Sequence, residues 1–210
     1  GARAVTYGTR PRCRVRIEDG HLTVDRRRVK LDLKSYGAYS RYNAAAAAAA
    51  AWAMGIDADV IARGLAAHTP GMLRQEPLAH ASGAMLMLDA YNANPASMLA
   101  SVEAFVEQYA ARTLTLVLGD MKELGPASAK FHAELGTWLA TLPLKAVYLA
   151  GPEMTAAVDA LSAASPRFRI EHSLDAMGWS NGLKTALNAQ DAILFKASRA
   201  MRLEELARSL

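Results

Sequence analysis

Residues 84–98 read Ala-Met-Leu-Met-Leu-Asp-Ala-Tyr-Asn-Ala-Asn-Pro-Ala-Ser-Met. The first five residues follow Gly83 and form a short apolar run of the kind found in buried parallel strands. Pro95 is suited to the first turn of a helix that continues beyond it. The stretch is therefore a strand-to-helix crossing. In an open α/β sheet such crossings lie at the carboxyl ends of the strands, where ligands bind.

Four polar side chains occupy this crossing: Asp89, Tyr91, Asn92 and Asn94. A carboxylate, a phenol and two amides are well placed there to meet a ligand. Asp89 and Asn94 are equally suited to capping the helix and to satisfying turn amides, because short polar side chains commonly do both. Position alone leaves these two interpretations open.

The crossing is the first of a series that the sequence predicts after residue 76. Apolar runs at 85–88, 114–118, 146–150, 168–171 and 192–196 each precede a helical pattern. The helices are expected near 96–110, 127–139, 154–164 and 174–187, the last with Ser173 as its N-cap, and from 202 onward. This alternation predicts an α/β fold with a Rossmann-like, mostly parallel sheet. No Gly-x-Gly-x-x-Gly follows the first strand, so we expect no dinucleotide site.

The first 76 residues follow another pattern. Strands at 4–7, 13–17, 21–24 and 29–33 predict a small antiparallel β unit. Helices at about 41–54 and 57–68 follow, with Ser40 and Asp57 as expected N-caps and Gly55 ending the first. We therefore expect two parts, residues 1–76 and residues 77–210, of which the first is the end of an α/β domain.

The composition is ordinary for a globular protein with a buried core: 52% of the 210 residues are hydrophobic and 21% are charged. The longest apolar tract, 44–56, is too short to cross a bilayer, and residues 1–8 lack the apolar run of a signal peptide. Cys13 is the single cysteine, which permits no internal disulfide and suits a reducing compartment. We expect a cytoplasmic protein with no membrane insertion.

The net charge of +4 comes mainly from residues 10–30. Arg12, Arg14 and Arg16 alternate with apolar residues, which is typical of the solvated face of a half-buried strand. Aromatic residues are not interleaved with them, as single-strand binding would require. We expect no nucleic-acid partner.

Other candidates for chemistry are weak. The five histidines form no spaced ligand set, and His132 is expected to be a packing or surface residue on a helix. Ser97 lacks the Gly-x-Ser-x-Gly turn of a serine nucleophile. We expect no metal site built by this chain and no complete catalytic set within it.

Three blocks resemble the Mur ligase family in order and spacing. The first is Asp-x-Tyr-Asn-Ala-Asn-Pro-x-Ser-Met at 89–98, and the second is Gly-Asp-Met-Lys-Glu-Leu-Gly at 119–125. The third is Lys-Ala-Ser-Arg-Ala-Met-Arg-Leu-Glu at 196–204, in which Ala197 and Ala200 replace glycines common in the family. The resemblance covers essentially the whole chain but only the back part of the family's chain.

The resemblance implies an ATP-dependent amide ligase of peptidoglycan precursor synthesis, which serves the cell wall, cell shape and cell division. Such an enzyme uses ATP and Mg²⁺ to activate a UDP-muramoyl tripeptide as an acyl phosphate, which the amine of D-alanyl-D-alanine attacks. Residues 77–210 would be the family's Rossmann-like C-terminal domain and residues 1–76 the tail of its central ATP-binding domain. We expect a monomer.

The resemblance also assigns roles to residues. The nucleotide side would comprise Asp89, Tyr91, Asn92, Asn94, Arg74 and Asn43. The incoming dipeptide would meet Asp120, Lys196, Ser198 and Arg199, with Asp120 receiving its ammonium. In the loop before the helix at 41–54, Tyr39 and Ser40 stand where the family has His and Asn. The resemblance therefore does not extend to the polar contact that this loop usually makes in the family.

The 210 residues contain no Gly-rich phosphate loop ending in Gly-Lys-Thr or Gly-Lys-Ser, and no upstream magnesium-binding segment of the family. We therefore expect a C-terminal piece of a longer ligase, inactive alone. Two alternatives remain open. One is a related ligase such as a folylpolyglutamate synthase, and the other is a stand-alone, non-catalytic binding or regulatory module.

Overall fold

The computed structural model describes residues 4–210 and divides into two compact units, Gly1–Pro70 and Gly71–Leu210. The division falls after Pro70 rather than after residue 76. Leu73 is buried in the core of the second unit, and Glu76 begins the first strand of that unit's sheet. Residues 71–76, which were expected in the first part, therefore belong to the second unit.

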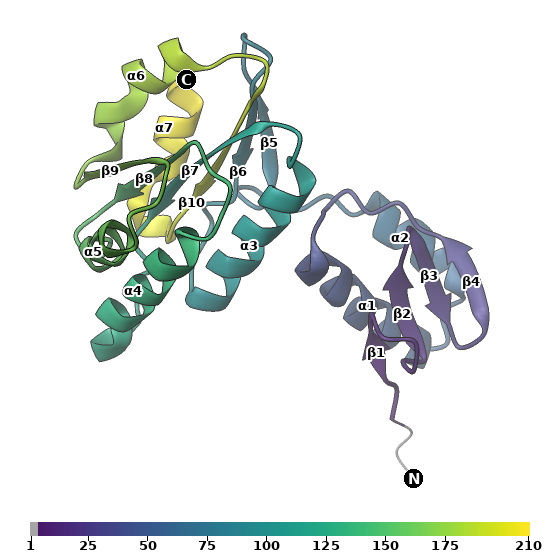
Figure 1. Ribbon diagram of the computed structural model, residues 1–210. Coiled ribbons are helices and arrows are strands. Elements are labelled where there is room, and N and C mark those ends of the chain that lie inside the picture. Colours follow the sequence, from purple (N-terminus) through teal and green to yellow (C-terminus); the bar gives the residue numbers. More distant parts are fainter. Residues whose placement is uncertain (1–3) are drawn as a thin grey trace. The chain divides into compact units, whose positions relative to one another are not determined.

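The first unit is a small sheet covered by two helices (Figure 1). Alternate residues of the strand at 15–18 are buried, as expected for a strand with one face on a core. Val15, Ile17 and Leu22 pack against the alanines of the first helix. The elements are β1 (Tyr7–Gly8), β2 (Val15–Glu18), β3 (His21–Val24), β4 (Arg27–Lys30), α1 (Ala38–Ala53) and α2 (Ala58–Ala67).

Two details of this unit differ from expectation. The sheet is not wholly antiparallel, because the loop at 9–14 returns the chain so that β1 runs parallel to β2. Helix α1 begins after Gly37, which has a φ of 88° that glycine adopts readily, so Ser40 lies inside the helix rather than at its cap. Asp57 is confirmed as the N-cap of α2, since its side chain accepts the Asp59 N–H.

The second unit contains a six-stranded sheet in the order β5-β6-β10-β7-β8-β9, in which only β5 is antiparallel to its neighbour. The predicted mostly parallel α/β fold is confirmed. The strands are β5 (Glu76–Ala79), β6 (Met85–Leu88), β7 (Thr113–Gly119), β8 (Ala146–Ala150), β9 (Arg169–Ser173) and β10 (Asp191–Lys196).

Helices cover both faces of this sheet (Figure 1). Leu183, Leu203 and Leu206 of α6 and α7 join one core with the strand residues Leu88 and Phe195. Helices α3, α4 and α5 lie on the other face, and α4 packs on α5. The helices are α3 (Pro95–Gln108), α4 (Ser128–Leu139), α5 (Thr155–Ala164), α6 (Ser180–Ala186) and α7 (Leu203–Ser209).

Two features of the second unit were not predicted. Strand β5 was missed because Pro77 interrupts a four-residue run, although proline is tolerated on an edge strand such as this one. The helix expected at 174–187 is divided into a 3₁₀ turn, Ala176–Trp179, and the short α6, and Asp175 rather than Ser173 caps the turn. Between residues 4 and 210, no helix is both long and apolar enough to span a membrane.

Candidate functional site

The four strands β6, β10, β7 and β8 are parallel neighbours, so their carboxyl ends meet at one edge of the sheet. The three blocks that resemble the Mur ligases follow β6, β7 and β10. We call this edge the rim and define it as residues 89–94, 120–125, 151–154 and 196–199. Segments more than a hundred residues apart in the sequence are thereby brought together.

A buried ion pair joins the first block to the third. Lys196, whose side chain is 3% exposed, places Nζ 2.9 Å from Oδ2 of Asp89, which is 17% exposed. The same ammonium donates to the backbone oxygen of Asn92 at 3.2 Å, and Ser101 Oγ donates to Asp89 Oδ2 at 2.6 Å. Buried charges are tolerated only when paired in this way. The pair therefore fixes the loop after β6 against the end of β10.

The two amides of the first block make local hydrogen bonds. Asn94 Oδ1 accepts the Ser97 N–H at 2.8 Å, and Ser97 Oγ accepts the Asn94 N–H at 3.0 Å, which is a reciprocal cap at the start of α3. Asn92 Oδ1 accepts the N–H of Ala93 at 2.8 Å. The capping interpretation thus holds for Asn94, whereas Asp89 pairs with Lys196.

Ser198 links all three blocks. Its Oγ donates to the backbone oxygen of Ala93 at 3.3 Å and accepts the backbone N–H of Lys122 at 2.8 Å. Since Ser198 is buried, both bonds are sheltered from water. One hydroxyl therefore sets the spacing between the loops that follow β6, β7 and β10.

Asp120 is fully buried, and each of its oxygens has a partner. Oδ1 accepts the Met154 N–H at 3.0 Å, and Oδ2 lies 2.8 Å from Lys122 Nζ. Lys122 Nζ also lies 2.9 Å from Oε1 of Glu153. An ammonium group of the protein itself thus occupies the place where we expected a substrate's ammonium.

Glu153 is a rim residue that the sequence reasoning missed. It follows β8, and its Oε2 accepts a hydrogen bond from Ser128 Oγ at the start of α4. The position of Glu153 at a carboxyl strand end was the available signal, because the same rule selected Asp89 after the first strand. None of the three blocks that resemble the Mur ligases covers residues 151–154, so Glu153 was not among the predicted site residues.

These contacts shift two pKa values. The hydrogen bond from Ser128, and then that from Lys122, hold the pKa of Glu153 below its ordinary value. Hydrogen bonds to Asp120 and Glu153 raise the pKa of Lys122. Both groups are therefore charged across the neutral pH range.

We expect the Glu153 interaction to be lost in acid. Because the pKa of Glu153 is lowered in the folded protein, its contribution to the free energy of unfolding is present above the ordinary value of 4.5 and disappears as the pH falls through the folded value. When urea unfolding is measured across this acid range, the free energy of unfolding should fall more steeply with decreasing pH for the wild type than for Glu153→Gln. Glu134→Gln, an exposed carboxylate on α4, is the matched control and should keep the wild-type slope. Identical slopes for Glu153→Gln and the wild type would contradict the expectation.

His132 is buried behind this network. Its Nε2 accepts the Met121 N–H at 3.1 Å, which assigns the proton to Nδ1, and Nδ1 then donates to the backbone oxygen of Ser128 at 2.8 Å. Both ring nitrogens are occupied, and the side chain is inaccessible. His132 therefore packs α4 against the loop after β7, and the neighbouring Ser128 has no free imidazole base.

Arg74 and Tyr91 form a platform on the second unit. The guanidinium of Arg74 lies 4.1 Å from the centre of the Tyr91 ring, and the backbone N–H of Tyr91 donates to Leu73 O at 3.1 Å. Tyr91 is exposed, so the platform offers an aromatic face and a cation to solvent. Asn43, the remaining nucleotide-side candidate, is exposed on α1 of the first unit.

Arg199 lies at the outer side of the third block, where it forms an ion pair with Glu204 of α7. The Arg199 side chain is exposed, whereas Glu204 is buried, and its Oε2 has no hydrogen-bond partner among residues 4–210. Glu204 thus directs an accessible guanidinium near the rim.

Other charged groups form ion pairs outside the rim. On the basic strands, Arg14 pairs with Asp25 at 3.0 Å and Arg16 with Glu18 at 2.7 Å, while Arg27 contacts Asp57 and Asp59. Much of the positive strand face is therefore neutralised. Within the described residues, no group of three or more His, Cys, Asp or Glu side chains is placed to hold a metal ion.

Known proteins match this chain over the segment that contains the rim. The family model described as "Mur ligase, glutamate ligase domain" matches residues 73–199. The chain is 30% identical to the UDP-N-acetylmuramoyl-tripeptide–D-alanyl-D-alanine ligase of Bacillus subtilis (strain 168), over 98% of this chain and 46% of that protein. The chain thus spans less than half the length of this relative.

Solved structures show the same likeness. A crystal structure of MurF from Acinetobacter baumannii has a TM-score of 0.78 at 29% identity, covering 90% of this chain and 41% of that one. MurF ligase from Thermotoga maritima in complex with ADP has a TM-score of 0.71 at 28% identity, covering 93% and 44%. The family match extends over more than half of the chain and includes the whole rim, and we conclude that the chain belongs to the Mur ligase family.

Proposed function

We propose that this chain is the C-terminal part of the ATP-dependent ligase that joins D-alanyl-D-alanine to a UDP-N-acetylmuramoyl tripeptide in peptidoglycan precursor synthesis. The observation that carries the proposal is the hydrogen-bonded rim, in which Ser198 links all three family blocks. The relatives that bear the name of this reaction support it. Since the chain spans less than half of their length, the activity belongs to the complete protein.

The rim suits one side of a nucleotide. The exposed ring of Tyr91 and the guanidinium of Arg74 are complementary to a base and to a phosphate, respectively. The chain has no phosphate loop, and among the described residues no group of three or more His, Cys, Asp or Glu side chains is placed to hold a metal ion. We therefore assign the binding of Mg²⁺ and of most of the ATP phosphates to residues outside this chain. When bound, ATP supplies the phosphoryl group that activates the tripeptide carboxylate.

The chain's own residues position the reactants and exclude water. The Asp89–Lys196 pair holds the nucleotide-side loop, and Asp120 holds Lys122 at the end of β7. The exposed guanidinium of Arg199 is suited to the carboxylate of the dipeptide, because arginine binds carboxylates in a bidentate manner. Attack of an amine on an activated carboxyl group needs this kind of preorganised charge and a dry site.

The remaining assignments follow from the same proposal. We place the protein in the cytoplasm, where nucleotide-linked precursors and ATP are available, and we propose a monomer. Residues up to the division at Pro70 would form the tail of the central ATP-binding domain, and the second unit would be the family's C-terminal domain. Asn43 of the first unit would contribute to the nucleotide side.

An acceptor test distinguishes this function from its alternatives. The complete protein is incubated with Mg-ATP and UDP-muramoyl tripeptide, together with either D-alanyl-D-alanine or glutamate, and ADP release and product mass are measured. We expect ADP release and a product larger by one dipeptide only with D-alanyl-D-alanine. A parallel incubation replaces the tripeptide with a folate as the carboxylate substrate, and turnover there with glutamate as the acceptor would favour a folylpolyglutamate synthase. Binding without ADP release would favour a non-catalytic module.

A further inference from the structure

The carboxylates of the rim differ in how accessible their oxygen atoms are to a ligand. Asp120 is 0% exposed with both oxygens bonded, and Oδ2 of Asp89 is shared by Ser101 and Lys196. The Glu153 side chain is 31% exposed. An incoming group that carries a positive charge can therefore reach Glu153 more readily than either aspartate.

Lys122 shows that an ammonium group fits beside Glu153. Its Nζ lies 2.9 Å from Glu153 Oε1 and 2.8 Å from Asp120 Oδ2, and its side chain is 35% exposed. The ammonium of Lys122 stands in chemically for any primary ammonium that approaches from solvent. A carboxylate oxygen accepts more than one hydrogen bond, so Oε1 retains capacity for a second donor.

The position of Glu153 is fixed from three sides. Ser128 of α4 donates to Oε2, and Lys122 binds Oε1. The Met154 N–H, next in the chain, is bonded to buried Asp120 at 3.0 Å. Gly151 is packed so closely on Asp120 that a Cβ there would lie 2.5 Å from the carboxyl carbon. The side chain is therefore held in place before any ligand arrives, which lowers the entropic cost of binding.

We propose that Glu153, held at the rim by Ser128 and Lys122, is the residue that binds the ammonium group of the acceptor dipeptide. Asp120 then acts as a positioning residue, because it holds Lys122 and the Met154 backbone beside Glu153. The inference rests on the proposed function, since it concerns the acceptor of that reaction.

The test compares two ligands that differ only in the charged group. One is D-alanyl-D-alanine, and the other is D-lactyl-D-alanine, in which a hydroxyl replaces the ammonium. In the complete protein, Glu153→Gln should raise the KM for D-alanyl-D-alanine by about 10- to 100-fold, the range expected for a lost charge-assisted hydrogen bond. The inhibition constant for D-lactyl-D-alanine should change by less than about 3-fold, since a neutral donor gains little from the carboxylate's charge. KM values for ATP and for the tripeptide should not change.

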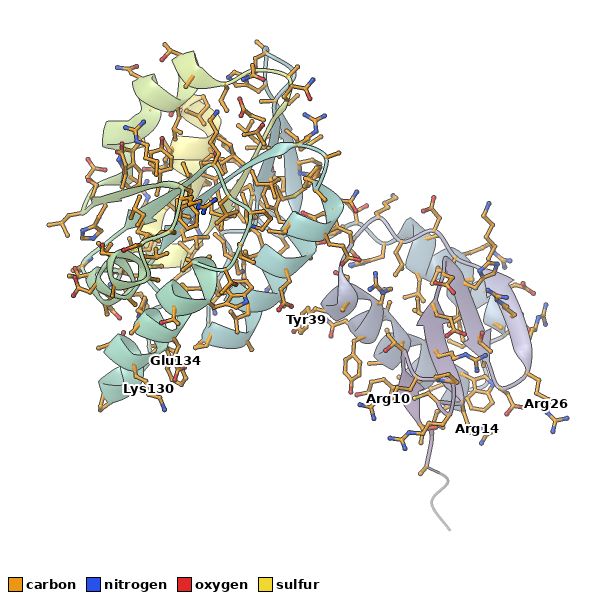
Figure 2. All side chains as sticks on the ribbon, in the orientation of Figure 1. Arg10, Arg14, Arg26, Tyr39, Lys130 and Glu134 are labelled. Atoms are coloured by element: carbon orange, nitrogen blue, oxygen red, sulfur yellow. The ribbon has the colours of Figure 1, made fainter. Side chains whose placement is uncertain are left out.

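Two further variants keep the result interpretable. Glu134→Gln alters an exposed carboxylate on α4, which is labelled in Figure 2 and pairs with Lys130 at 3.8 Å, and this variant should leave all constants unchanged. Ser128→Ala keeps the charge of Glu153 but removes one of its hydrogen bonds. This variant should raise the KM for D-alanyl-D-alanine by a smaller factor than Glu153→Gln does, and should leave the other constants unchanged. Ser128→Ala therefore supplies the test if Glu153→Gln does not fold.

The outcomes separate the two proposals. If Glu153→Gln weakens the binding of both ligands equally, or of neither, the proposed role of Glu153 is overturned while the ligase function stands. A wild-type protein that shows no turnover with D-alanyl-D-alanine would instead overturn the proposed function, and this inference with it.

Discussion

Replacing Lys196 by methionine is expected to lower the free energy of unfolding of the second unit by about 3–5 kcal/mol, the usual cost of removing one partner of a buried ion pair. Methionine preserves most of the apolar stem of lysine, so most of the buried apolar volume is retained. The Asp89 carboxylate, however, would keep only the Ser101 hydroxyl as a side-chain partner. The backbone oxygen of Asn92 would also lose its donor. Urea unfolding at pH 7 measures the loss.

A double substitution tests the cause. Asp89→Asn combined with Lys196→Met removes both charges, so the double variant should recover a substantial part of the loss. Lys130→Met is the matched control, because Lys130 is exposed on α4 and its removal should change the free energy of unfolding by no more than about 0.5 kcal/mol. A loss below about 1 kcal/mol for Lys196→Met would show that the pair is hydrated rather than buried.

The strands of the second unit were predictable because each is a short apolar run followed by a helical pattern. The runs at 85–88, 146–150 and 192–196 fall within one residue of β6, β8 and β10. The order of the strands was not predictable, since β10 is inserted between β6 and β7 by long-range packing. Pro77 concealed β5 for a local reason, because proline is compatible with a strand only at an edge, and edges are not visible in a sequence.

The rim was predictable as a set of residues but not as a set of bonds. The rule that ligands meet carboxyl strand ends selected Asp89, the family resemblance added Asp120, Lys196 and Ser198, and the structure brings all four to one edge. Which cation neutralises which carboxylate depends on side-chain reach across neighbouring strands. Lys122 and Glu153 were not among the predicted site residues, yet their contact forms the accessible end of the network.

Replacing Gly151 by alanine is expected to lower the free energy of unfolding by about 2–4 kcal/mol, as the sum of backbone strain and overpacking. Gly151 has a φ of 106°, and a Cβ there would lie 2.5 Å from the Cγ and both oxygens of Asp120. Asp120 has a short side chain tied to Met154 and Lys122, so it cannot withdraw without breaking those bonds. Urea unfolding measures the effect, and Gly125→Ala is the control. Gly125 has a φ of 56° and open space around its Cβ, so alanine there should cost only strain, about 1–2 kcal/mol.

The energetic cost of the clash with Asp120 can be measured by removing the Asp120 carboxyl group. In an Asp120→Ala background the carboxyl group is absent, so Gly151→Ala should cost less than it does in the wild type, because only the backbone strain at a φ of 106° remains. The difference between the two backgrounds is then the energy with which the end of β8 is pressed against Asp120. If Gly151→Ala costs the same in both backgrounds, the contact is loose, and Asp120 does not fix the position of the Glu153 segment. A large difference would mean that residue 151 must be glycine because Asp120 is buried beside it, and that the acceptor side of the rim is rigid before substrate binds.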